Sequence, residues 1–262
     1  MNSWSRTRKR IILSLVLFVV TILIGIPAFF LFYQKPTCFD RKLNGDEKEV
    51  DCGGSCQLIC SAESLPIISK GDPRVLTVAP NVFEVVALLD NPNSGAEISR
   101  AHYTLKIFDS VSTIALKTIE GETFVPKGAT FAIFAGPFTL EAGLVPTRAI
   151  LEWDKGSLIW HKNTKVLLEI IVRDKLLSNE DSSPRFEAMV GNGTLESISN
   201  IDFVALISDE EGNIFAASKT FIDTLAPNEN APIIFTWPRP FSKKAAQLDI
   251  ITRILPDRSF IK

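Results

Sequence analysis

The sequence has little of what most enzymes and nucleic-acid-binding proteins use. Its 262 residues include two histidines and four cysteines and carry a formal net charge of −2. The motifs G-x-S-x-G and H-E-x-x-H and the phosphate-binding loop are absent, and neither His102 nor His161 stands in a catalytic pattern. Without excess positive charge, nucleic acid is excluded as a partner. We therefore predict a non-enzymatic protein, with calcium as the one candidate cofactor.

Charge is missing altogether from one long segment. Residues Ile11–Tyr33 contain no acid or base, and as a helix they would span about 34 Å, enough to cross a bilayer. The positive-inside rule places residues 1–10 in the cytoplasm, because the segment is preceded by four basic residues, Arg6, Arg8, Lys9 and Arg10. We predict an uncleaved signal anchor at residues 11–33 with the remaining chain outside the membrane. A cleaved secretory signal is the alternative, but no small-residue cleavage box follows.

All the cysteines fall in residues 38–60, at positions Cys38, Cys52, Cys56 and Cys60. An even number of cysteines outside the cytoplasm favours two disulfides. A zinc site is the alternative, but the spacing lacks the paired C-x2-C knuckles of zinc ribbons. Four cysteines allow three pairings, and Cys56–Cys60 is disfavoured because it closes a very small ring. We favour Cys38–Cys56 with Cys52–Cys60.

The same segment is rich in side-chain oxygen atoms around Gly45. These atoms could surround a hard cation, and the candidate calcium ligands are Asp40, Asn44, Glu47 and Asp51. An acidic solvated loop held by disulfides is the simpler alternative. The segment resembles a cysteine-rich motif of bacterial surface and secreted proteins, C-x-D-G-x-x-N-x-x-E-x-x-x-D-C-G-G-x-C-x-x-C, which implies a surface module. It departs from the motif at Arg41, which replaces Gly, and in having three residues before Cys60.

Beyond a linker at Ser61–Asp72, short alternating runs separated by turn-forming residues replace any helical pattern. The predicted strands are Phe83–Leu89, Arg100–Phe108, Thr113–Ile119, Thr130–Ala135, Thr147–Trp153, Phe186–Val190, Ile201–Ile207, Ile214–Phe221, Ala231–Trp237 and Leu248–Ile254. The runs on either side of Leu105 and Ala205 match at an offset near 100 residues, which indicates a duplication. The alternation places Asp202 and Ser208 on a solvent-facing side.

We predict an all-β body of two tandem Ig-like antiparallel β-sandwiches, residues 73–158 and 159–262. The runs V-A-L-L-D-N-P-N and I-S-R-A-H-Y-T-L-K-I-F-D resemble the water-stress type of late-embryogenesis-abundant domain. The runs I-S-N-I-D-F-V-A-L-I-S-D-E-E-G-N and L-A-P-N-E resemble the small bacterial FxLYD-type sandwich. Both resemblances imply a scaffold or binding module and transfer no active site.

These features together predict a single-pass protein of the cell membrane with its C-terminal body outside the cytoplasm. The expected role is non-catalytic binding or structural support in the cell envelope, with an envelope protein or a surface ligand as partner. The alternative is an accessory subunit of an envelope secretion or pilus-type assembly. A large exposed apolar patch on one sandwich would favour that alternative.

Overall fold

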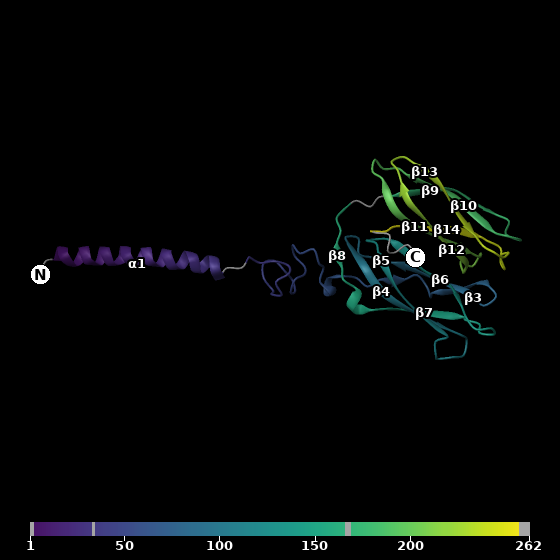
Figure 1. Ribbon diagram of the computed structural model, residues 1–262, viewed down its shortest axis with the longest axis horizontal. Helices are drawn as coiled ribbons and strands as arrows, with labels where there is room; N and C mark the ends of the chain where they lie inside the picture. The colour runs from purple at the N-terminus through teal and green to yellow at the C-terminus, as the bar shows by residue number, and fades with distance from the viewer. Residues whose placement is uncertain (1–2, 33–34, 166–168, 257–262) are drawn as a thin grey trace. The chain divides into compact units, whose positions relative to one another are not determined.

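The computed structural model describes residues 3–32, 35–165 and 169–256 (Figure 1). Tyr33, the last residue of the predicted membrane span, and residues 257–262 of the predicted second domain lie outside the described residues. The chain divides into two compact units, residues 1–56 and 57–262. The described residues confirm the fold class, an all-β body that follows one N-terminal apolar helix.

Helix α1 runs from Ser3 to Phe32, and its segment Thr7–Phe30 is long and apolar enough to cross a membrane by length and composition. It begins before the predicted span because the basic residues ahead of Ile11 are good helix formers and continue it. Large apolar side chains such as Leu13 and Phe18 are exposed along it. A water-soluble helix normally buries such side chains, whereas a bilayer would cover them.

The first half of the body forms two antiparallel sheets. In one, β3 (Val82–Asp90) pairs with β1 (Ile68–Ser69), β2 (Arg74–Ala79) and β6 (Thr130–Thr139). In the other, β4 (Ala96–Phe108) pairs with β5 (Lys117–Val125), β7 (Arg148–Trp153) and the short β8 (His161–Lys162). Alternate residues of both sheets, among them Val85, Leu105 and Phe131, form a shared buried core. Short 3-10 turns, η1 (Ser61–Glu63) and η2 (Lys155–Ser157), lie in the connections.

The second half repeats this pairing scheme for its six main strands and has no described counterpart of the short strands β1 and β8. Strand β10 (Arg185–Asn192) pairs with β9 (Ile170–Ser178) and β13 (Asn230–Thr236), as β3 pairs with β2 and β6. Strand β11 (Ile198–Ser208) pairs with β12 (Ile214–Leu225) and β14 (Gln247–Ile254), as β4 pairs with β5 and β7. A second core fills this sandwich. Nine of the ten predicted strands coincide closely with observed ones, whereas the predicted strand Thr113–Ile119 is displaced, because β5 begins only at Lys117. The common topology supports the duplication.

Each repeat has a buried asparagine at the end of a central strand, after β3 in the first repeat and at the end of β10 in the second. The side-chain amide of Asn91 donates to the carbonyls of Ala96 and Pro126. Asn192, 101 residues later, donates in the same way to the carbonyls of Glu196, Leu225 and Ala226. In both repeats the amide ties the end of one sheet to backbone carbonyls at or beside the ends of two strands of the other sheet.

The two sandwiches pack on each other through one face of each. The main apolar cluster at this junction has six buried side chains, namely Leu76, Val86, Ala132, Val204, Leu206 and Ala217. Figure 1 shows β3 and β6 of the first sandwich next to β11, β12 and β14 of the second, with β9, β10 and β13 on the far side. The expectation that Asp202 and Ser208 face solvent is wrong: both are buried. Strand alternation identifies two faces of β11, but the junction and the core cover both.

The division between the sandwiches differs from the predicted one. Strand β8 pairs with β4, and Trp160 belongs to the first core. Strand β1 also adds residues before position 73 to the first sandwich. The change from one sandwich to the other therefore falls between Lys162 and Ile170, after the predicted boundary at residues 158 and 159. The sequence did not indicate four strands. Strands β1 and β8 have only two residues each, too short for an alternating pattern. Strands β2 and β9 are largely exposed, so no regular apolar alternation marks them.

Candidate functional site

The cysteine segment is cross-linked as the sequence indicated. Cys38 is bonded to Cys56, and Cys52 and Cys60 are disulfide-bonded as well. All four cysteines lie in the described part of the chain, and none of them is free. Because disulfide sulfurs are not thiolates, these residues offer no zinc ligand set.

The four candidate calcium ligands make hydrogen bonds within the loop itself. The Asp51 carboxylate accepts from the backbone N–H of Arg41 at 3.1 Å, and Glu47 Oε2 accepts from that of Asn44 at 3.2 Å. Asp40 accepts from the Asn44 side-chain amide at 2.8 Å, and this hydrogen bond lowers the pKa of its carboxyl. The loop is therefore shaped by side-chain to backbone hydrogen bonds.

The structure does not gather these carboxylates around one point. Among the described residues, the closely spaced candidate ligand groups are Cys38–Glu47–Cys56 and Glu49–Cys52–Cys60, and each contains two disulfide-bonded cysteines. Of the four predicted ligands, only Glu47 belongs to either group. The calcium site stays a prediction.

A larger candidate site lies in the body, at the junction of the sandwiches. Strands β5 and β6 follow each other in the chain but belong to opposite sheets of the first sandwich. A cavity of about 720 Å³ lies beside them, lined also by β4 and by β11, β12 and β14 of the second sandwich. This volume lies within the range of small-molecule sites, roughly 300–1,000 Å³.

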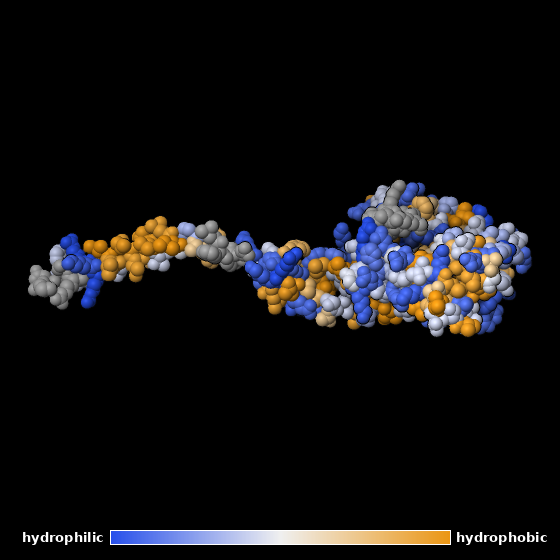
Figure 2. Space-filling model, turned by 60° about the horizontal axis from the view of Figure 1, so that its bottom comes forward, coloured by the Kyte–Doolittle hydropathy of each residue, from blue (hydrophilic) through white to orange (hydrophobic). Residues whose placement is uncertain are grey.

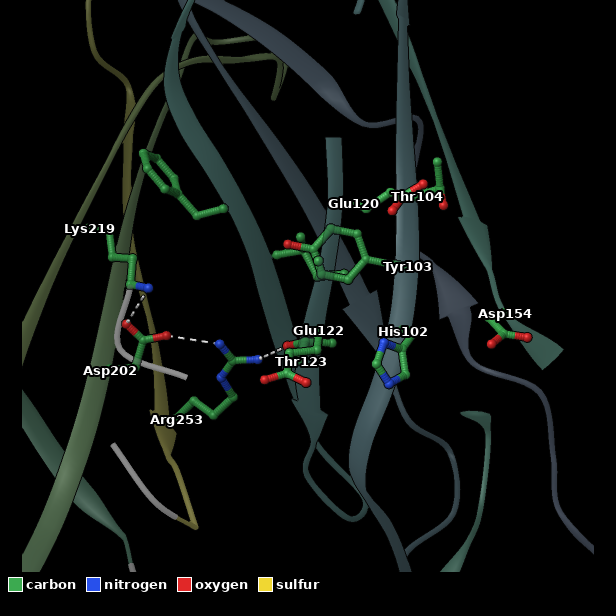
Figure 3. Close-up of a pocket in the computed structure, with 13 residues that line it drawn as sticks. His102, Tyr103, Thr104, Glu120, Glu122, Thr123, Asp154, Asp202, Lys219 and Arg253 are labelled. Carbon is green, nitrogen blue, oxygen red and sulfur yellow. Dashed lines mark hydrogen bonds and ion pairs between the residues drawn. The ribbon is translucent and has the colours of Figure 1, made fainter. Parts of the chain in front are cut away.

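Three charged side chains form the wall contributed by the second sandwich (Figure 3). Asp202, on β11, is 2% exposed and accepts from Arg253 of β14 at 2.9 Å. Lys219 Nζ, on β12, lies 3.7 Å from the other Asp202 oxygen. Arg253 also donates across the junction, to Thr123 Oγ1 at 2.7 Å and to the Phe124 carbonyl at 3.1 Å. The arginine therefore joins the two sandwiches and at the same time neutralises the buried aspartate.

The wall contributed by the first sandwich is partly aromatic. Tyr103 on β4 stands directly opposite Gly121 on β5. A Cβ at position 121 would lie 2.5 Å from the phenol oxygen, so the ring requires a glycine beneath it. Figure 3 shows the Tyr103 hydroxyl directed toward the side of the cavity that holds Lys219 and Asp202. Burial raises the pKa of the phenol, and the charge of Arg253 partly opposes this effect.

The rim of the cavity is acidic, with Glu120, Glu122 and Asp154 among its lining residues. Glu122 pairs with Arg100 at 2.8 Å. His102 also lines the cavity, but no described catalytic partner accompanies it. Sequence reasoning missed this site because its residues come from six strands of two repeats. The one available signal was a charged residue on each of three strands of the second repeat, Asp202, Lys219 and Arg253.

Comparison with known proteins assigns no family. No family model matches the chain, and no curated protein matches it. Among solved structures, the crystal structure of red sea bream transglutaminase has a TM-score of 0.23 at 10% sequence identity. The match covers 78% of this chain and 32% of the transglutaminase chain. A likeness of this degree transfers no activity to this protein.

Proposed function

We propose that the protein is a non-catalytic binding protein of the cell envelope, tethered by α1 and carrying its two-sandwich body outside the cytoplasm. The observation that supports this most is the exposed apolar surface of α1 together with the basic residues at its N-terminal end (Figure 2). Basic residues on one side of a span remain in the cytoplasm, which places the other side outside.

The cysteines provide a second, independent support. All four are oxidised, and disulfides persist in oxidising compartments outside the cytoplasm. A segment of this size buries little apolar surface, so covalent bonds stabilise its shape.

Non-reducing peptide mapping of protein recovered from native membranes tests the compartment. Thiols are blocked with an alkylating reagent before lysis, so that no disulfide forms during preparation. We expect a Cys38–Cys56 linked peptide and no alkylated cysteine. Four alkylated cysteines would place the segment in a reducing compartment and contradict the proposal.

One observation favours a role as a subunit of an envelope assembly as a second candidate. Val111 and Ile114, in the turn after β4, are 88% and 78% exposed, and Val145 in a neighbouring turn is exposed too. Arg148, the first residue of β7 after the Val145 turn, donates to the Ser112 carbonyl in the turn after β4. Affinity purification from detergent-solubilised native membranes tests this function. Loss of a co-purifying envelope protein in a Val111→Asp, Ile114→Asp variant supports it, and unchanged retention contradicts it.

A further inference from the structure

The junction cavity contains a buried acceptor atom that lacks a donor. In the described structure, Asp202 Oδ1 accepts no hydrogen bond, and Lys219 Nζ at 3.7 Å is within ion-pair range but beyond hydrogen-bond distance. An unsatisfied buried polar atom costs about 1–3 kcal/mol, and more when it is charged. A group that occupies the cavity and donates to this oxygen would recover that free energy.

The charges around the oxygen restrict what this group can be. A ligand ammonium would donate to Asp202 but would lie beside Lys219 and Arg253, which carry the same charge. A ligand carboxylate or phosphate would pair with the two cations but would be repelled by Asp202 and would leave Oδ1 without a donor. A neutral hydroxyl meets both requirements, because it donates one hydrogen bond and accepts others. It could therefore bridge Asp202 Oδ1 and Lys219 Nζ.

The rest of the cavity requires more than one hydroxyl. Its volume of about 720 Å³ is far larger than one water. Its apolar lining includes Tyr103, Ile133 and Phe134, and the carboxylates of Glu120 and Asp154 at the rim accept hydrogen bonds. A sugar ring presents apolar C–H groups and several hydroxyls on one rigid frame, so it matches both kinds of wall.

We propose that this cavity binds a neutral pyranose, either a free sugar or the end of an envelope glycan, with one ring hydroxyl bridging Asp202 and Lys219. This inference rests on the proposed binding function and names its ligand class. Lys219 and Tyr103 are then ligand-contacting residues, whereas Arg253 positions Asp202.

The test uses the full chain in lipid nanodiscs, because detergents with sugar headgroups would compete for the cavity. Saturation-transfer NMR monitors methyl β-D-glucopyranoside, methyl β-D-galactopyranoside and N-acetylglucosamine, each also as its β-1,4-linked disaccharide. Glutamate and arginine serve as charged probes of similar size. Lys219→Met removes the bridging cation, Tyr103→Phe removes only a hydroxyl, and Lys244→Met is the matched control at an exposed position.

We expect at least one neutral pyranose to bind. Lys219→Met should weaken its binding about tenfold or more, since a hydrogen bond to a charged group is worth about 1.5–3 kcal/mol. Tyr103→Phe should weaken it severalfold with the fold intact, and Lys244→Met should leave it unchanged. Stronger signals from the disaccharides would identify a glycan end as the ligand, and equal signals a free sugar.

Two results would overturn the proposal. The first is the absence of binding by every neutral sugar at about 10 mM, a concentration that detects even weak sites. The second is binding that stays unchanged in every folded variant of the cavity. Binding of glutamate in place of sugars, lost in Lys219→Met, or of arginine in place of sugars, strengthened in Lys219→Met, would overturn the ligand class but leave the binding function standing. The location of the body is tested separately, by thiol blocking and by protease.

Discussion

The two sandwiches share a pairing scheme but differ in how the equivalent strands β3 and β10 meet their surroundings. Glu84 on β3 and Arg185 on β10 correspond at the 101-residue offset of Asn91 and Asn192. Arg185 pairs with Glu187 on an accessible surface, whereas Glu84 is buried where the second sandwich covers β3. Its carboxyl accepts from the Ala217 N–H of the second sandwich.

The turns after β4 and β11 differ in a similar way. Both begin with an aspartate whose carboxylate accepts backbone N–H groups, Asp109 from Ser112 and Asp209 from Asn213. Beyond this shared start, the first turn carries exposed Val111 and Ile114, and the second carries Glu210 and Glu211. The repeats keep the residues that satisfy the backbone and differ where side chains meet solvent or a partner.

The largest expected effect comes from breaking the contact that joins the repeats. Arg253→Met removes the hydrogen-bonded cation of buried Asp202, leaving only Lys219 in ion-pair range, and removes two hydrogen bonds to β5. We expect the free energy of unfolding to fall by about 3–5 kcal/mol. Urea denaturation followed by tryptophan fluorescence measures it, since Trp160 and Trp237 report on separate cores. Arg239→Met, at an exposed position, is the control, and equal losses in both variants would contradict the role of Arg253.

Because Glu84 is buried on β3 and its counterpart Arg185 on β10 is accessible, β3 should make the stability of the protein depend on pH. Burial raises the pKa of the Glu84 carboxyl to about 7. The folded state therefore holds a proton that the unfolded state releases above its ordinary pKa near 4.5. Stability should fall by up to about 3 kcal/mol as pH rises from about 4.5 to 7. Denaturation across this range should show the slope in the wild type and a smaller slope in Glu84→Gln, and identical slopes would contradict the assignment.

The asparagine pair tests whether the duplication keeps an energetic role as well as a position. Asn91→Ala and Asn192→Ala remove two and three hydrogen bonds to backbone carbonyls, so each should cost about 2–3 kcal/mol. Asn192 donates to one more carbonyl than Asn91, and the loss should be at least as large there. The same urea denaturation measures both variants. A loss confined to one repeat would show that the asparagines are not equivalent.

The smallest effect is expected at the turns. Val111→Ser with Ile114→Ser changes side chains that are exposed in the folded protein. The free energy of unfolding should stay within about 0.5 kcal/mol of the wild type. Thermal denaturation checks this expectation. A loss of more than about 1 kcal/mol in the free energy of unfolding would mean that the turn packs against the body.

The sequence predicted those strands in which apolar residues alternate with polar ones because one face of the strand is buried in a core. Val85, Ala87 and Leu89 enter the first core at every second position, and Phe186, Ala188 and Val190 enter the second in the same way. Alternation could not indicate that the opposite face is covered as well. For that reason the sequence predicts Asp202 and Ser208 in solvent, and it does not predict the burial of Glu84.

The cavity could not be predicted for a related reason. Its polar residues lie up to 151 residues apart, from His102 to Arg253, and meet only once the two sandwiches have packed together. The disulfide segment is the opposite case. Its cysteines, and the carboxylates of Glu47 and Asp51, interact within a short stretch of chain. The spacing of the cysteines alone therefore restricts which of them can form disulfides.

Protease added to intact cells or spheroplasts, with tags at both ends of the chain, tests the central claim most directly. We expect the C-terminal tag and all residues beyond about position 35 to be digested. The N-terminal tag should survive on a fragment that contains α1, because the basic residues before Ile11 hold that end in the cytoplasm. A body that stays protected until the membrane is permeabilised would contradict the proposed location and the binding role that depends on it.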